Sequence, residues 1–135
     1  MKTLIISIWW ILLSPFAKAQ SAVYVYKNPQ KAEGHFMCMR GLTNQREAEL
    51  LSRQKLEELV NNDKMISLYA TTDKKGYGVV IKSEILVQGK KMSIFGAALG
   101  CKSYKEAEAK ALKNLKEKNP EWSGGNYVIV YKFKD

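Results

Sequence analysis

Apolar and polar positions follow the same succession of patterns twice along the chain. In each half, two runs rich in β-branched and aromatic residues predict strands, and a stretch with apolar residues every three or four positions then predicts a helix. A third β-rich run closes each half. Glycine, proline and asparagine separate these stretches, as expected for turns. The pattern therefore predicts two units, each with the order strand, strand, helix, strand.

The second unit has the clearer boundaries. Ser103 and Glu106 match a capping box, in which hydroxyl and carboxylate groups satisfy backbone N–H groups at the start of a helix. Pro120 ends that helix, because proline cannot continue one. The turn at 87–90 contains Gly89, which we expect at positive φ. The predicted elements are strands at 77–85 and 92–99, a helix at about 104–118 with the stripe Tyr104, Ala107, Ala111, Leu115, and a strand at 127–133.

The first unit repeats this order with a longer turn at 28–34. Asn44 and Glu47 supply the same kind of helix cap. The predicted elements are strands at 23–27 and 35–40, a helix at about 45–61, and a strand at 65–70. The buried stripe that we predict for this helix is Ala48, Leu51 or Ser52, Leu56 and Leu59.

Residues 36–60 align with residues 95–119 without a gap, with Phe36 over Phe95. Duplication of one unit explains this register, and chance similarity between two segments rich in helix-forming residues is the alternative. Neither unit alone covers both faces of its sheet, whereas two units together can. We therefore predict an α+β fold of two β-β-α-β repeats sharing one core, with two helices packed on an antiparallel or mixed sheet of about six strands. The predicted domain spans 20–135, with copies at about 22–72 and 76–134.

The first 19 residues match a secretory signal. Lys2 precedes an apolar run at 4–13, and Ala17-Lys18-Ala19 places small residues where a signal peptidase cleaves. The alternative is a membrane anchor, which needs about 18 apolar residues, and this run is shorter. We therefore expect cleavage between Ala19 and Gln20, a secreted or periplasmic protein, and no transmembrane segment in the mature chain.

Cleavage at this point leaves 116 of 135 residues, with 20 basic and 13 acidic side chains and a net charge of +7. That length suits one domain with one core. The positive charge favours anionic partners such as an acidic protein or an envelope polysaccharide. An alternative is that the spread lysines serve only solubility.

The mature chain holds two cysteines, Cys38 and Cys101. A disulfide between them persists in an oxidising compartment if the strands that carry them are neighbours. The other interpretation has Cys38 as a small buried hydrophobe and Cys101 as a free thiol. The sequence leaves both states open.

The second unit resembles small secreted bacterial domains of unknown function. These domains share a Gly-aliphatic strand, an aromatic-Gly strand, a capped Ala-rich helix and a closing strand. The residues that carry the resemblance are Gly78–Ile81, Phe95-Gly96, Ser103, Ala107, Ala111-Leu112 and 128–131. The resemblance implies secretion and a small α+β fold, and it implies no particular activity.

No set of residues matches a catalytic, metal or cofactor site. His35 and Cys38 lie three positions apart, and such residues face opposite sides of a strand. One histidine and two distant cysteines do not match a zinc site. Neighbouring helical carboxylates such as Glu106 and Glu108 do not face each other, and the Gly-x-Gly at 76–78 does not lie between a strand and a helix, as a phosphate loop requires. We therefore expect no enzyme activity and no cofactor.

The start of the second predicted helix is a candidate nucleic-acid surface. Lys102 and Lys105 resemble the lysine cluster of double-stranded-RNA-binding domains. Glu106 and Glu108 offset that charge, and an exported protein rarely meets duplex RNA. We therefore do not expect nucleic acid as a partner.

Basic residues alternate with aromatic ones in the second unit, which suits an anionic partner. Lysines on edge strands also protect sheets from aggregation, and this alternative stays open. The candidate surface is Lys82, Lys90, Lys91, Tyr131 and Lys132. The sequence thus predicts an exported, non-enzymatic binding or accessory module for an envelope protein or anionic polysaccharide. The alternatives are a secreted inhibitor of an envelope hydrolase, acting through the turn at 28–34, or a small secreted enzyme.

Overall fold

The structure is a computed structural model, and it describes residues 20–42, 45–60 and 65–135. The predicted signal lies outside the described residues. In chain order the elements are β1 (Gln20–Asn28), β2 (Glu33–Leu42), α2 (Gln45–Val60), β3 (Ile66–Thr72), β4 (Tyr77–Val87), β5 (Lys90–Cys101), α3 (Tyr104–Lys118) and β6 (Val128–Lys134). We call β1 to β3 with α2 the first unit, and β4 to β6 with α3 the second unit.

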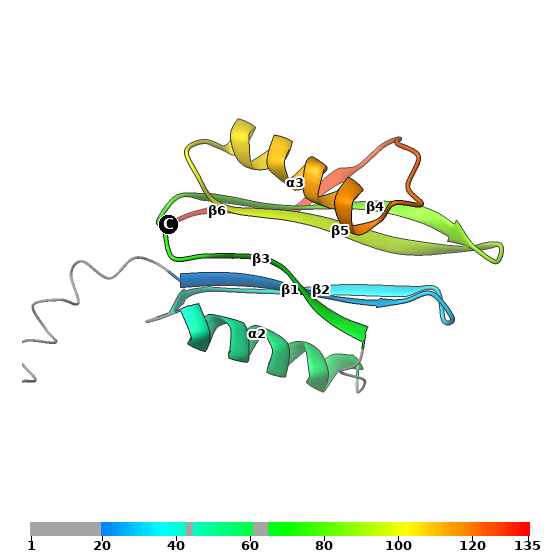
Figure 1. The fold of residues 1–135 in the computed structure, drawn as a ribbon, viewed down its shortest axis with the longest axis horizontal. Helices are drawn as coiled ribbons and strands as arrows, with labels where there is room; N and C mark the ends of the chain where they lie inside the picture. The colour runs from blue at the N-terminus through cyan, green and yellow to red at the C-terminus, as the bar shows by residue number, and fades with distance from the viewer. Residues whose placement is uncertain (1–19, 43–44, 61–64) are drawn as a thin grey trace, which may run out of the picture.

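The two units form four layers. The strands lie in two three-stranded antiparallel sheets with the orders β2-β1-β3 and β5-β4-β6. Figure 1 shows the sheets face to face, with α3 covering the outer face of one and α2 the outer face of the other. The predicted α+β class of two helices and six strands is confirmed among the described residues. The strands are divided between two sheets because each helix covers one face of its own sheet, and each sheet covers the inner face of the other.

The pairing of strands is irregular at corresponding places in the two units. Each shift in the second unit follows its counterpart by 57 positions. The shifts occur at Gln20/Ala22 and Val23/Tyr24 in the first unit, and at Tyr77/Val79 and Val80/Ile81 in the second. A β-bulge twists and bends the strand that contains it. The two sheets therefore share the same distortions and present similar surfaces to each other.

Corresponding residues of the two units meet between the sheets. The Phe36 and Phe95 rings, which the sequence alignment pairs, have centroids 5.2 Å apart. The backbone at Gly34 approaches Ser93 so closely that a Cβ on Gly34 would clash with the Ser93 carbonyl oxygen. The buried residues of this inter-sheet cluster are Val23, Val25, Val80, Phe95 and Ala97. The same surface of each unit is thus buried against the other, as in a two-fold arrangement.

The helix α3 packs on its sheet through small residues. Ala107, Ala111 and Leu115 are buried, as the sequence predicts, whereas Tyr104 at the start of the stripe is 37% exposed. Gly96 on β5 permits this approach, because a Cβ there would lie 2.7 Å from the Leu115 nitrogen. The predicted N-cap is confirmed, since the Ser103 hydroxyl accepts the N–H of Glu106 at 3.1 Å.

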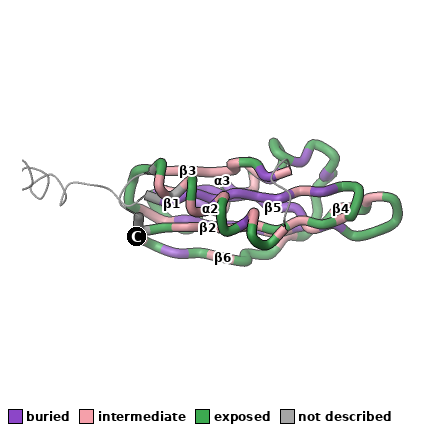
Figure 2. Tube along the Cα trace, turned by 90° about the horizontal axis from the view of Figure 1, so that it is seen from below, coloured by how far each residue is buried: buried purple, intermediate pink, exposed green. Residues whose placement is uncertain are grey.

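The helix α2 packs on the other sheet with one departure from the predicted stripe. Ser52 and Leu56 are fully buried, but Leu59 is 66% exposed, so its predicted burial is wrong. Val60, four residues after Leu56, packs in the core instead. The buried stripe therefore follows a spacing of four residues to the end of the helix. Buried residues lie on the central strands β1 and β4, on β5 and on α3, and exposed residues lie at the hairpin tips and loops (Figure 2).

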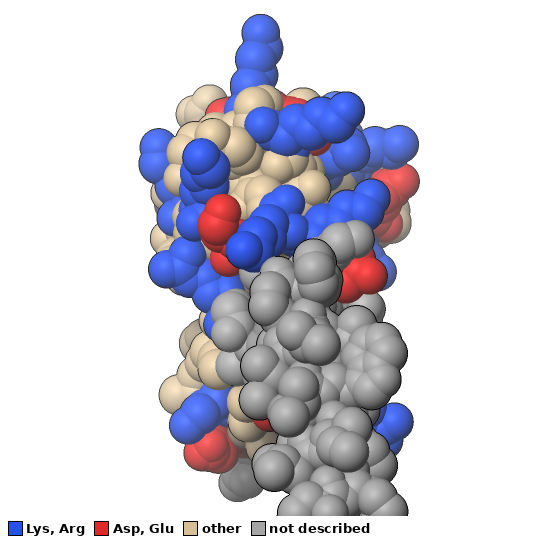
Figure 3. Space-filling model, turned by 90° about the vertical axis from the view of Figure 1, so that its left-hand side faces the viewer, with Lys and Arg blue, Asp and Glu red and all other residues tan. Residues whose placement is uncertain are grey.

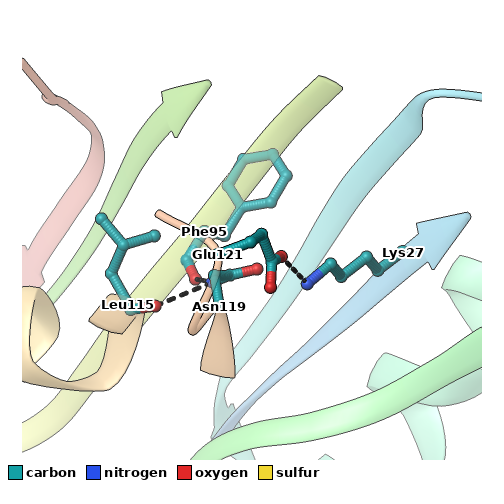
Figure 4. A network of polar contacts seen from close by, with 5 residues as sticks. All are labelled: Lys27, Phe95, Leu115, Asn119 and Glu121. Carbon is teal, nitrogen blue, oxygen red and sulfur yellow. Dashed lines mark hydrogen bonds and ion pairs between the residues drawn. The ribbon is translucent and has the colours of Figure 1, made fainter. Parts of the chain in front are cut away.

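Two asparagines of the second unit cover the free edge of β5. Asn114 accepts the N–H of Ala97 at 2.9 Å and donates to the carbonyl of Tyr69 at 3.2 Å. Asn119 donates to the carbonyls of Leu115 at 2.9 Å and Phe95 at 3.3 Å (Figure 4). These bonds occupy backbone groups that an exposed sheet edge would leave free.

An ion pair near Asn119 joins the two units. The ammonium of Lys27 on β1 lies 2.6 Å from the Glu121 carboxylate, just after α3 (Figure 4). Burial opposes ionisation of Glu121, but the hydrogen bond and the charge of Lys27 outweigh it and lower the pKa of this carboxyl. The contact thus adds a polar link beside the inter-sheet cluster. Within the described ranges, no helix has the length and apolar character needed to cross a bilayer.

Candidate anion-binding surface

The structure separates the residues of the predicted partner surface. Lys90 and Lys91 lie at the tip of the β4–β5 hairpin, where Lys90 pairs with Val87. Lys132 lies on β6 and pairs with Val79, near the opposite end of β4. Eight strand positions, or about 26 Å, separate Val79 from Val87. Lys132 and the two hairpin lysines therefore do not form one site.

The other two predicted residues lie elsewhere. Lys82 lines a hollow of about 430 Å³ together with Glu84 and Trp122. The carboxylate of Glu84 offsets the charge of Lys82 there. Tyr131 packs against the inter-sheet cluster, with its ring centroid 5.5 Å from that of Phe133. Neither residue extends the charge of the hairpin tip.

A different set of lysines comes together around a hollow at one end of the molecule. Figure 1 shows that this end holds the C-terminus. The link between β3 and β4, the start of α3 and the end of β6 meet there. Gly100 has φ of +66°, and a Cβ there would clash with the Thr72 hydroxyl, so glycine allows β5 to pass this link. The β3–β4 link, the end of β5 and the start of α3 border a hollow of about 610 Å³, lined by Lys74, Lys75, Gly76, Tyr77, Gly100, Cys101, Lys102, Glu106 and Lys110.

The lining of this hollow carries an excess of positive charge. Its four lysines are exposed, and with Glu106 they give a net charge of +3. Glu106 is engaged in the helix cap, where its carboxylate accepts the N–H of Lys102 at 2.8 Å. That backbone hydrogen bond is the main reason that the pKa of Glu106 is lowered. The carboxylate therefore stays ionised in the cap, and the lysine ammonium groups face solvent.

Two tyrosines extend the hollow towards β6. The rings of Tyr77 and Tyr104 meet edge to face, with centroids 4.6 Å apart. The ammonium of Lys132 lies 5.0 Å from the Tyr104 ring centroid, and that of Lys134 lies 5.3 Å from the Tyr77 centroid. Such contacts hold each ammonium near an aromatic face while leaving it hydrated. We call the lysines and tyrosines at this end of the molecule the basic end. Its members are Lys74, Lys75, Lys102, Lys110, Lys132, Lys134, Tyr77 and Tyr104.

Figure 3 views the molecule from this end. Basic side chains gather on the half that the second unit forms, with few acidic side chains among them. Of the five residues that the sequence predicts for a partner surface, Lys132 belongs to the basic end. The other lysines were missed because they come from three separate segments. In the sequence Glu106 and Glu108 dilute them, but in the structure Glu106 caps α3 and Glu108 accepts the Tyr127 hydroxyl at 2.7 Å.

Both cysteines belong to the described residues, and both are free thiols. Cys38 packs between the sheets, whereas Cys101 lies under α3 on the other face of the second sheet. The disulfide that the sequence allows is therefore not formed in this structure. Burial raises the pKa of Cys38 to about 12 and also raises the pKa of Cys101. Neither thiol has the depressed pKa of a nucleophile.

His35 lies apart from both thiols. Its ring stacks on Tyr26, with centroids 6.0 Å apart, on the face of the sheet that α2 covers. Cys38 lies on the opposite face of β2, as the strand period predicts. Over the described part of the chain, no group of three or more His, Cys, Asp or Glu side chains is placed to hold a metal ion.

The turn at 28–34, the candidate inhibitory loop, is held against the second unit. The Asn28 carboxamide accepts the N–H groups of Gln30 at 3.1 Å and Lys31 at 3.3 Å. Ala32, at φ of +53°, packs against the core cluster under α3. This turn is therefore short and anchored, which is unlike an extended loop that enters the active site of another protein.

Comparison of the chain with protein-family models, with curated proteins and with solved structures finds no match. The resemblance of the second unit to small secreted domains therefore stays a prediction. The conclusions on function rest on the geometry described above.

Proposed function

We propose that the protein is an exported, non-enzymatic binding module that holds an anionic partner at its basic end. The observation that carries this proposal is the convergence of six lysines and two tyrosines from three distant segments. Four of these lysines line a hollow in which the lining acid is already engaged, and Lys132 and Lys134 lie over the two tyrosine rings. An arrangement of this kind attracts carboxylate, phosphate or sulfate groups.

Export is part of the proposal. Gln20, the first residue after the proposed cleavage site, is also the first residue of β1. Cleavage between Ala19 and Gln20 therefore leaves both sheets intact. Outside the cytoplasm, the matching partners are an acidic envelope protein or an anionic polysaccharide. We also propose that duplication of one unit produced the chain, since the bulges and the inter-sheet contacts correspond in the two units.

The geometry favours a partner with several charges. A single negative charge about 6 Å from one exposed ammonium gains only about 0.7 kcal/mol in water. A useful affinity therefore requires several such pairs at once, as a polymer or an acidic polypeptide segment provides. Because exposed pairs are screened by salt, binding should weaken steeply as ionic strength rises.

Retention on immobilised heparin tests this proposal with a matched pair of variants. Lys74→Glu with Lys75→Glu alters the basic end, whereas Lys90→Glu with Lys91→Glu makes the same change of charge at the hairpin tip. We expect the first variant to elute at a clearly lower salt concentration than the second. Equal shifts for the two variants would mean that net charge, and not the basic end, governs binding, and the proposal would fail.

A further inference from the structure

The strand β6 is one of the two outer strands of its sheet, and it exposes apolar side chains. Within the described part of the chain, β6 pairs with β4 along one edge, and no strand pairs with its other edge. Val128 is 59% exposed, Ile129 42% and Val130 38%. A free edge with consecutive exposed apolar residues is a template for another strand.

The outer strands β5 and β3 differ from β6 in how their edges are covered and in the side chains that they expose. The free edge of β5 is covered by Asn114 and Asn119. In the first unit, Ser67 of β3 occupies the place that corresponds to Val128, as their pairing with Val25 and Lys82 shows. An exposed serine is polar where β6 presents valine. Leu68 and Tyr69, which correspond to Ile129 and Val130, are apolar but partly buried against the core clusters, whereas Ile129 and Val130 are exposed. The exposed apolar edge is thus found on β6 and not on its counterpart β3.

The same strand leads into the basic end. Lys132 and Lys134 follow the three apolar residues and project towards Tyr104 and Tyr77. The edge of β6 therefore has an apolar half and a basic half. A partner that fits both halves needs apolar side chains at one end and acidic side chains at the other.

We propose that β6 receives an extended segment of a partner protein by strand addition, with acidic residues beside Lys132 and Lys134 and apolar residues beside 128–130. This inference rests on the proposed function and assigns it a polypeptide as its anionic partner. Main-chain hydrogen bonds supply affinity in this mode, and the flanking side chains supply specificity. If β6 paired with the β6 of a second copy, the added strand would supply no acidic residue, because Val128–Lys134 contains none.

The direction of pairing fixes the order of residues in the segment. In an antiparallel pair, the start of the added strand lies opposite the end of β6, which is Lys134. The segment should therefore carry its acidic residues first and its apolar residues after them. Side chains alternate between faces, so every second residue of the acidic part faces the lysines.

A labelled synthetic peptide, acetyl-Glu-Thr-Glu-Thr-Val-Thr-Val-amide, tests this inference by fluorescence anisotropy with the purified protein. Two further peptides carry N-methyl groups on alternate amides, one in each of the two possible registers. Only one edge of an added strand bonds to β6, so one N-methylated peptide should bind about tenfold more weakly, and the other should bind as the parent does. Lys132→Gln with Lys134→Gln should weaken binding of the parent peptide, more at low salt than at high salt.

The outcomes separate this inference from the function on which it rests. If both N-methylated peptides bind as well as the parent, or if no peptide binds while the basic end still governs heparin retention, strand addition is overturned and the proposed function stands. If one register alone blocks binding but the lysine variant binds normally, strand addition stands and the role of the basic end fails. A dimer in sedimentation without peptide, with the β6 amides protected from exchange, would show a second copy on β6 and would also overturn the inference.

Discussion

Replacing Asn119 with aspartate changes a hydrogen-bond donor into an acceptor with almost no change of shape. Asn119 is fully buried, and its amide group donates to the carbonyls of Leu115 and Phe95. These two bonds tie the end of α3 to the free edge of β5. A carboxylate at this position would place a negative oxygen against the same two carbonyl oxygens.

The cost of this change follows from the acidity of the new carboxyl. Burial and the two carbonyls favour its protonated form, so its folded-state pKa rises above the ordinary value of about 3.9. Holding it protonated at pH 7, about three units above that value, costs up to about 4 kcal/mol. For a domain of 116 residues, the number at 20–135, this corresponds to a fall in Tm of roughly 15 °C.

The alanine variant separates the loss of a donor from the gain of an acceptor. Asn119→Ala removes two hydrogen bonds, but it also removes a buried carboxamide oxygen that has no hydrogen-bond partner among the described residues. The two effects offset each other in part, so we expect a loss of about 1 kcal/mol. At pH 7, the aspartate variant should therefore be the less stable of the two by about 3 kcal/mol.

The pH dependence has a definite sign. Since the folded-state pKa of the new carboxyl is raised, the unfolded chain releases its proton first as pH increases. The aspartate variant is then destabilised above the unfolded-state pKa, and the loss grows until the folded-state pKa is reached. The gap between the two variants should shrink between pH 7 and pH 4.

Urea unfolding followed by circular dichroism at both pH values measures these differences. Asn126→Asp, at an exposed asparagine, is the matched control and should change stability by less than about 0.5 kcal/mol. If the two Asn119 variants are equally stable at pH 7, the side chain does not donate to these carbonyls, and the account of the β5 edge is wrong.

Three further predictions concern packing and the thiols. Gly96→Ala should destabilise the protein by about 1–3 kcal/mol in urea unfolding, since the added Cβ meets the backbone of α3; wild-type stability would show that α3 packs elsewhere. Leu56→Ala should cost about 2–5 kcal/mol in the same assay, whereas Leu59→Ala at an exposed site should cost little; similar losses would contradict the correction to the stripe. Cys38 and Cys101 should react with Ellman's reagent at pH 8 only after unfolding, because burial raises the pKa of both thiols. Rapid reaction of either thiol in the native protein would contradict this prediction.

Local patterns predicted the elements well where local physics determines them. The helix α3 spans the predicted residues, because Ser103 satisfies its first turn and Pro120 prevents its continuation. Gly89 takes the positive φ that the hairpin turn requires. The sequence aligns Phe36 with Phe95 as corresponding residues of the two units. The structure shows that their rings are also in contact.

Features that depend on distant contacts were not predictable in the same way. The division of the strands into two sheets depends on which faces the two units bury, and no local pattern encodes that choice. Leu59 and Val60 are both apolar, and only the packing of α2 on its sheet determines that Val60 is the one that contacts the core.

The basic end is the clearest case of a feature that depends on distant contacts. Lys75, Lys102 and Lys132 come from a link, a helix start and an edge strand. Their proximity follows from the β4–β6 register, together with the passage of β5 past the β3–β4 link. The charge-rich hairpin tip was the more conspicuous pattern in the sequence, but it lies at the other end of β4.

The most direct test of the proposed site is a titration of the isotope-labelled protein with a short heparin oligosaccharide, followed by amide NMR shifts. We predict that the largest shifts lie at 74–77, 100–110 and 132–134, and that the hairpin tip at 87–91 changes little. Shifts centred on Lys90 and Lys91, or spread evenly over all lysine-bearing segments, would contradict an anion site at the basic end.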